Sequence, residues 1–193
     1  MTTADPNSIH NGRPNGRNDP LLLAGRILTI LMQGLMAFVA LCLLIAIPAA
    51  LFFSDNIQAE LVAEHGAQIG AFPSFAIAAI LLLALGLIAA AFIFFGKLRA
   101  IINSVGDGDP FAPENADRLT AMAWLSLGAY AIMAMIVAVA LPITDWAKQI
   151  GDAEANFDFG FDLTGILMII VLFILARVFR HGAAMREDLE GTV

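Results

Sequence analysis

The sequence predicts an all-α polytopic membrane protein in which four transmembrane helices form two hairpins. Of its 193 residues, 60% are hydrophobic and only 14% are charged, whereas about a quarter of the residues of an ordinary soluble domain are charged. The chain also contains four long stretches with few or no charges, and more polar segments separate them. This pattern is typical of a chain that crosses a bilayer several times.

Four membrane spans are expected, at about residues 27–53, 70–95, 119–142 and 161–180. The first three exceed the roughly 20 apolar residues that a spanning helix needs. The fourth reaches that length only if Arg177 extends its guanidinium toward the headgroups, as cations near helix ends commonly do. Pro48 and Pro142 lie toward the outer ends of the first and third spans, where we expect them to end the helices.

Residues 1–20 predict a disordered cytoplasmic tail ahead of a membrane domain at residues 21–193. The tail is rich in Asn, Gly, Pro and Asp and has almost no large apolar side chain, so it buries too little surface to offset the entropy of ordering. A secretory signal is the alternative, because Arg26 precedes an apolar run. That run is about twice the length of a signal's apolar region and lacks a clear cleavage site, so we expect it to remain as the first span.

The ten Lys and Arg residues predict the orientation of the spans. Three precede the first span, three lie between the second and third, and three follow or end the fourth, which leaves only Lys148 on the other side. Because cytoplasmic segments are enriched in Lys and Arg, both termini and the central loop are expected in the cytoplasm. The nine residues on that side are Arg13, Arg17, Arg26, Lys97, Arg99, Arg118, Arg177, Arg180 and Arg186.

The two outer connections are acidic, and the second is also aromatic. Their acids are expected to be ordinary solvated loop residues, and attraction of cations is the alternative. Aromatic side chains, Trp and Tyr above all, are enriched at the membrane–water interface. The expected outer anchors are Trp146, Phe157, Phe159 and Phe161.

The predicted spans carry no ionisable side chain near their centres, although such groups usually mark transport pathways. Gln33, Ser126 and Tyr130 are the main polar side chains there, and we expect them to make hydrogen bonds between helices. Cys42 is expected to be a small buried apolar residue. Small residues such as Gly86 and Ala90 recur at packing distance, which favours close contacts within the chain or between copies in a homo-oligomer.

No catalytic, cofactor-binding or metal-binding pattern is evident. His10, His65 and His181 are far apart in the sequence, and one cysteine cannot form a cysteine metal site. The chain also lacks a nucleophile elbow, a zinc-helix motif and a phosphate loop. We therefore expect no enzyme activity, no cofactor and no metal.

The central cytoplasmic loop has the most informative sequence. Apolar residues of residues 98–105 recur at helical spacing, so the second span is expected to continue as an amphipathic helix. Gly106 and Gly108 are expected to end that helix. Pro113, followed by Glu114, is typical of a new helix start, because proline suits the first helical position and an acid favours the first turn.

Two segments carry a family resemblance: the loop Gly108-Asp109-Pro110-Phe111 with Glu114, Asn115, Arg118 and Leu119, and the ending Arg186-Glu187-Asp188-Leu189-Glu190-Gly191-Thr192-Val193. With the four spans, they resemble the domain of unknown function family 2975, which comprises small four-helix membrane proteins of bacteria. The ending departs from the commoner family form at Gly191, where a leucine often stands. The resemblance implies the bacterial inner membrane and no established activity. Members are often encoded beside a small helix-turn-helix regulator, which implies such a protein as a cytoplasmic partner.

Two interpretations of the loop and the ending remain open. In one they bind the cytoplasmic partner, so that the chain is a regulatory or scaffold protein without direct contact to nucleic acid. In the other they fold the hairpin, with Phe111 dipping into the bundle or the interface and Arg118 pairing with Glu114. An oligomeric transporter or channel is the alternative function. The candidate residues are Gly108, Asp109, Pro110, Phe111, Glu114, Asn115, Arg118, Arg186, Asp188 and Leu189.

Overall fold

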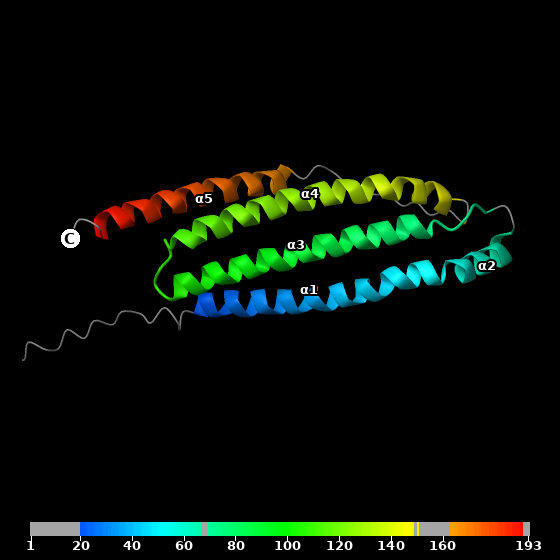
Figure 1. Ribbon diagram of the computed structural model, residues 1–193, viewed down its shortest axis with the longest axis horizontal. Coiled ribbons are helices and arrows are strands. Elements are labelled where there is room, and N and C mark those ends of the chain that lie inside the picture. Colours follow the sequence, from blue (N-terminus) through cyan, green and yellow to red (C-terminus); the bar gives the residue numbers. More distant parts are fainter. Residues whose placement is uncertain (1–19, 67–68, 149, 151–162, 191–193) are drawn as a thin grey trace, which may run out of the picture.

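Five helices make up the part of the chain that the computed structural model describes, which is residues 20–66, 69–148, 150 and 163–190. The expected tail, apart from Pro20, and the expected anchors Phe157, Phe159 and Phe161 lie outside the described residues. Figure 1 shows the order of the helices along the chain. They are α1 (Pro20–Phe52), α2 (Ser54–His65), α3 (Ser74–Gly106), α4 (Pro113–Ala147) and α5 (Leu163–Glu190).

Four of these helices are long and apolar enough to cross a membrane: α1, α3, α4 and α5. The described residues contain no strand. The prediction of an all-α chain with four spans is therefore confirmed. A helix of 33 residues, such as α1 or α3, is about 50 Å long, whereas the hydrocarbon core is about 30 Å thick. The long helices thus continue past the hydrocarbon.

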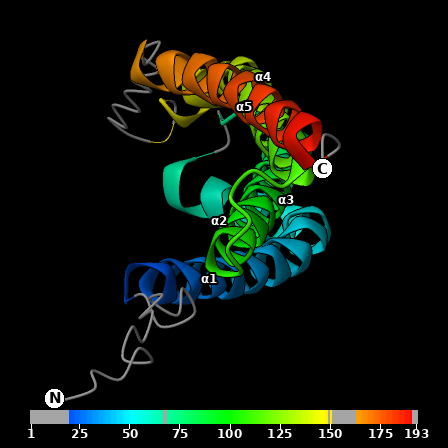
Figure 2. The same cartoon turned by 90° about the vertical axis from the view of Figure 1, so that its left-hand side faces the viewer.

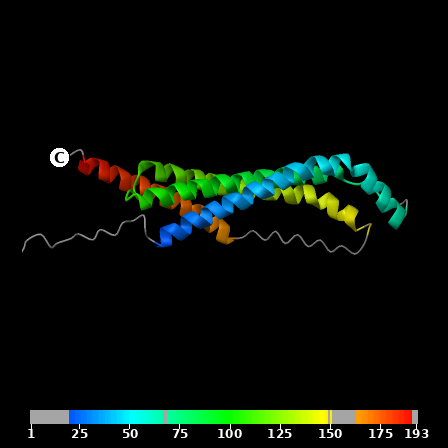
Figure 3. The same cartoon turned by 90° about the horizontal axis from the view of Figure 1, so that it is seen from below.

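The four long helices form an open, curved layer. Helix α1 packs on α3, α3 on α4, and α4 on α5, so α1 and α5 lie at opposite edges of the layer (Figure 2). Seen from below, α1 crosses the other helices at an angle (Figure 3). At one end of the layer α1 begins, α3 connects to α4 and α5 finishes; we call this end the loop end. The opposite end, where α2 lies, is called the α2 end (Figure 1).

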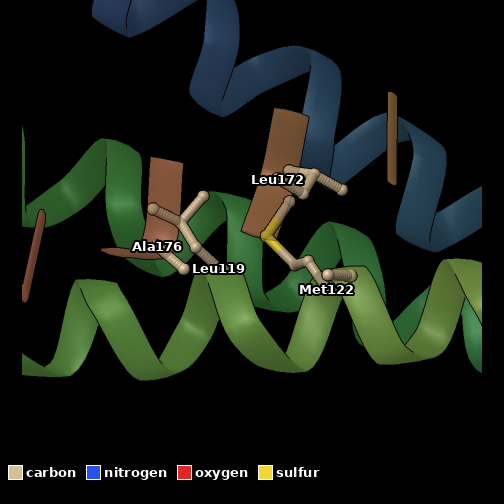
Figure 4. Close-up of a cluster of buried hydrophobic side chains, with 5 residues drawn as sticks. Leu119, Met122, Leu172 and Ala176 are labelled. Atoms are coloured by element: carbon tan, nitrogen blue, oxygen red, sulfur yellow. The ribbon is translucent and has the colours of Figure 1, made fainter. Parts of the chain in front are cut away.

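A small buried core joins α4 to α5 in the half nearer the loop end. Leu119 and Met122 of α4 face Leu172 and Ala176 of α5 (Figure 4), and Ala123 completes the cluster. Partly buried side chains of α3 pack against it. Most other large apolar side chains of the spans are exposed, which costs little in a membrane because lipid tails are as apolar as leucine.

Glycines let the long helices approach closely elsewhere. A Cβ atom on Gly25 would lie 3.2 Å from Cδ1 of Ile102, and one on Gly86 would lie 3.7 Å from Cδ1 of Ile132. Gln33 of α1 lies over Gly96 of α3, where a Cβ atom would be 3.2 Å from its Nε2. Small residues at such crossings allow the van der Waals contact that holds membrane helices together.

The α2 end is held by three contacts around the connection from α2 to α3. Gln58 of α2 accepts a hydrogen bond of 2.6 Å from the backbone N–H of Phe72. Trp146 of α4 donates from its indole to the carbonyl of Gly70 at 3.0 Å and packs edge-on against Phe72. The indole that the sequence predicts as an interface anchor thus also ties α4 to this connection.

Several sequence predictions are wrong in detail. Pro48 and Pro142 lie inside helices that continue past them, because a break in lipid would leave more backbone groups unsatisfied than one proline does. Cys42 is exposed, since it lies on a side of α1 that no other helix covers. Ser126 bonds to the carbonyl of Met122 in its own helix at 3.0 Å and not across helices, a common way to satisfy a serine in a span. Helix α2 was not predicted.

The open layer predicts which helices cross-link. With Cys42 replaced by serine, the pair Gly25→Cys and Ile102→Cys should react with a short thiol cross-linker, because these positions touch between α1 and α3. The pair Gly25→Cys and Val178→Cys should not react, because α1 and α5 lie at opposite edges of the layer. Peptide mass spectrometry of the purified protein measures both yields. Equal yields from the two pairs would indicate a closed bundle.

Candidate functional site

The turn between α3 and α4 is built by its backbone. Gly108 has a φ of +85°, a conformation that glycine adopts without steric cost. The N–H groups of Asp107 and Asp109 donate to the carbonyls of Asn103 and Ser104, each at 2.9 Å, so the last turn of α3 is closed. Helix α3 ends at Gly106 and α4 begins with Pro113 at its first turn, which confirms both predicted boundaries.

The side-chain amide of Asn115 is the polar centre of the loop end. It is wholly buried at 0% exposure, and its Nδ2 donates to Oγ of Ser104 at 2.7 Å and to the carbonyl of Pro110 at 3.0 Å. Ser104 uses its own proton toward the carbonyl of Ile101 at 2.8 Å. The side chain of Asn115, which belongs to α4, therefore links three segments, because one of its N–H groups bonds to α3 and the other bonds to the loop.

Arg118 completes this network and corrects a prediction. Its Nη1 donates to Oδ1 of Asn115 at 2.7 Å and to the carbonyl of Ala100 at 3.4 Å. The sequence predicts a pair with Glu114 instead, which is exposed and is not bonded to Arg118. The guanidinium of Arg118 bonds to the buried amide because Oδ1 of Asn115 needs a hydrogen-bond donor. A buried acceptor without a donor costs more free energy than an ion pair on the surface contributes.

The loop also packs on α5. The ring of Phe111 lies 5.6 Å from that of Phe179, centroid to centroid, and rests on Gly182, where a Cβ atom would come within 2.8 Å of the ring. Of the two open interpretations of Phe111, the structure shows contact with the helix layer, although 43% of the side chain stays exposed. Only glycine lets the ring approach the backbone of α5 this closely.

Two ion pairs flank this aromatic contact. Arg186 of α5 donates from Nη1 to Oδ1 of Asp109 in the loop. Arg180 lies one and a half turns earlier, and its Nη2 is 3.4 Å from both Oδ1 of Asp117 and Oγ1 of Thr120 on α4. We call the contacts of Phe111 and of these two arginines the loop–α5 contact.

Most of the residues predicted from the sequence meet in these two arrangements. Gly108 shapes the turn, Asp109, Phe111 and Arg186 form the loop–α5 contact, and Pro110, Asn115 and Arg118 form the network. The other three are exposed on the surface: Glu114, Asp188 and Leu189. Sequence analysis missed six participants, of which Gly182 left a signal, because glycine within a helix often marks a close approach. The six are Ser104, Asp117, Thr120, Phe179, Arg180 and Gly182.

The described residues supply little for chemistry at membrane depth. None of their His, Cys, Asp and Glu side chains gather in a group of three that could hold a metal. Open grooves of about 300 and 440 Å³ lie between α3 and α4 and between α1 and α3. Their walls are apolar apart from Ser126, so both grooves suit lipid tails better than a polar solute.

The fold defines a class: a multi-pass membrane protein with four spanning helices and a polar, hydrogen-bonded loop end. Within that class, the family model described as protein of unknown function (DUF2975) matches residues 27–193. The chain belongs to this family, as the loop and the ending predict. The comparisons with curated proteins and with solved structures gave no match.

Loss of the Asn115 amide should destabilise the protein. Asn115→Ala removes the Asn115 partner of the Pro110 carbonyl, of Ser104 and of Arg118, and among the described residues the last two keep only their bonds to the carbonyls of Ile101 and Ala100. The change should lower the free energy of unfolding by about 2–3 kcal/mol. Unfolding in mixed micelles with increasing sodium dodecyl sulfate measures the change. As a matched control, Asn103→Ala removes an exposed hydrogen bond to Arg26 and should cost about 1 kcal/mol or less. Equal losses would mean that the buried network contributes nothing special.

Proposed function

We propose that this chain is a regulatory membrane protein, without enzyme activity, that holds a cytoplasmic protein at the bacterial inner membrane. The observation that carries the proposal is the last part of α5, which continues beyond the membrane while the loop–α5 contact fixes it in place. A helix held in this way presents a defined surface to the cytoplasm, and defined surfaces bind at a lower entropic cost than mobile ones.

The end of α5 lies past the headgroups. The pair of Arg180 with Asp117 marks the level at which charges first appear on α4. From Arg180 to Glu190 the helix extends about 15 Å further, whereas the headgroup layer is only about 5–8 Å thick. Lipid tails therefore do not reach the last turn of α5.

Two apolar side chains are nevertheless exposed on this extension. Met185 is 52% and Leu189 72% exposed, and they lie one turn apart on the same side of α5. Apolar side chains that neither lipid nor protein covers favour a partner helix or groove. Methionine suits such a surface because its side chain adapts to different shapes.

The charge of the surroundings favours a basic partner. Glu187 and Asp188 are exposed on the same part of α5, so a partner with a basic face would be attracted. A small helix-turn-helix regulator, the class that the family resemblance suggests, carries a basic face for DNA. Binding of that face here would hold the regulator away from DNA. The grooves between α3 and α4 and between α1 and α3 do not favour the transporter alternative, because their walls are apolar apart from Ser126.

The proposal requires the loop end to face the cytoplasm. Seven of the eight Lys and Arg residues in the described part of the chain lie at the loop end, which supports this orientation. In a chain with Cys42→Ser, Glu114→Cys should react with an impermeant maleimide only after the inner membrane is opened. Glu60→Cys on α2 is the control and should react in intact spheroplasts. The reverse pattern would place the surface outside and end the proposal.

A charged surface should weaken partner binding. The partner is first identified by co-purification from native membranes, and the full chain in lipid nanodiscs should bind the purified partner. The double variant Met185→Lys with Leu189→Lys should bind it about tenfold or more weakly, because charges replace apolar contacts that are buried in the complex. The swap Met185→Leu with Leu189→Met keeps the surface apolar and should bind like the wild type. Microscale thermophoresis measures the dissociation constants.

Two results would contradict the proposed function. One is that no purified soluble protein binds the wild-type chain in nanodiscs. The other is that the lysine variant binds a partner as tightly as the wild type does, which would place the interface elsewhere. Both variants lie on an exposed turn of α5, so their thermal stability in detergent should match that of the wild type and separate loss of binding from loss of fold.

A further inference from the structure

An open groove of about 1010 Å³ runs along the exposed side of α5 at the loop end. Ile174 lines its end toward the centre of the membrane, and Arg177, Val178, His181 and Met185 follow along α5 toward the loop end. Phe111 also lines it. The groove therefore begins with an apolar side chain and continues with hydrogen-bond donors, in the order in which a phospholipid has tails and headgroup.

Arg177 and His181 differ from the other cations of α5. Arg180 and Arg186 are bonded to acids of α4 and the loop. Arg177 and His181 have no hydrogen bond or ion pair within the described part of the chain. They are four residues apart, so their side chains lie on one face of the helix. A guanidinium and an imidazole placed like this can both donate to the oxygens of one phosphate.

The depth of the two residues matches that of lipid phosphates. Arg177 lies one turn from Arg180, whose pair with Asp117 marks the first charges of α4. Ile174 and Val178 are exposed beside it and lie where acyl chains end. A free phosphate ion would reach the donors but would leave this apolar wall uncovered.

We propose that this groove is a binding site for an anionic phospholipid, with the phosphodiester between Arg177 and His181 and the acyl chains running past Ile174 toward the centre of the membrane. Basic pockets at the cytoplasmic side of membrane helices bind anionic headgroups in this way. Met185 of the proposed partner surface also lines the far end of the groove, whereas Arg177 and His181, which would bind the phosphate, are not part of that surface. A zwitterionic lipid is disfavoured because its own ammonium group already compensates its phosphate.

Native mass spectrometry of the full chain in neutral detergent tests the site. Titration with phosphatidylglycerol should give one tightly bound lipid, with an affinity about fivefold or more above that for phosphatidylcholine of the same acyl chains. Arg177→Gln with His181→Gln should remove this preference, and Arg177→Lys should keep most of it. Arg99→Gln is the matched control, because Arg99 also has no partner within the described residues but does not line the groove.

Three outcomes would overturn the proposal. Equal affinity of the wild type for the two lipids would mean ordinary contact with the membrane surface. Binding of inorganic phosphate that displaces phosphatidylglycerol, without a contribution from the acyl chains, would mean a free-anion site. Unchanged preference in the glutamine variant would place the lipid elsewhere. If the glutamine variant does not fold, the affinities of the wild type for the two lipids still test the proposal. The rise in the melting temperature of the wild type with each lipid is an independent readout.

Discussion

The side-chain amide of Asn115 is buried where α3, the connecting loop and α4 meet. A buried amide must find partners for both its donors and its acceptor, since each unmet group costs roughly 1–3 kcal/mol. Its donors are met by Ser104 and Pro110 and its acceptor by Arg118. Because these partners come from three segments, only one arrangement of the loop satisfies them all. That arrangement also places Phe111 over Gly182, so the position of the end of α5 follows from the amide.

The open layer explains why polar contacts at the two ends matter so much here. Lipid tails solvate the apolar sides of the spans as well as other helices would, so no hydrophobic force closes the bundle. The buried core joins only α4 and α5, with a contribution from α3. Close packing at glycines and hydrogen bonds at the ends supply the remaining cohesion. Arg26 to Asn103 and Gln58 to Phe72 are two such bonds, and each connects segments that are adjacent in the layer.

The sequence predicts those features that depend on composition and on local backbone chemistry. Span lengths follow from hydropathy, and the boundaries at Gly106 and Pro113 follow from what glycine and proline do to a helix. The family assignment could also be made from the loop and the ending. Partners could not be predicted, because Arg118 has a carboxylate at helical spacing and an amide nearby, and only burial decides between them. Nor could α2, whose mixed composition is equally compatible with a solvated loop.

The basic residues of the loop end divide into two groups, those that are bonded within the protein and those that are not. Arg26, Arg118, Arg180 and Arg186 are bonded within the protein, so they hold helices and loop together. Lys97, Arg99 and Arg177 have no partner within the described residues and remain available to phosphates. A sequence count treats all seven alike as a signal of orientation. The structure separates them, because a cation already paired with a protein oxygen gains less from a lipid. Affinity for anionic lipid should therefore follow the unpaired cations, and Arg177 in particular, because it lines a groove that also has apolar side chains.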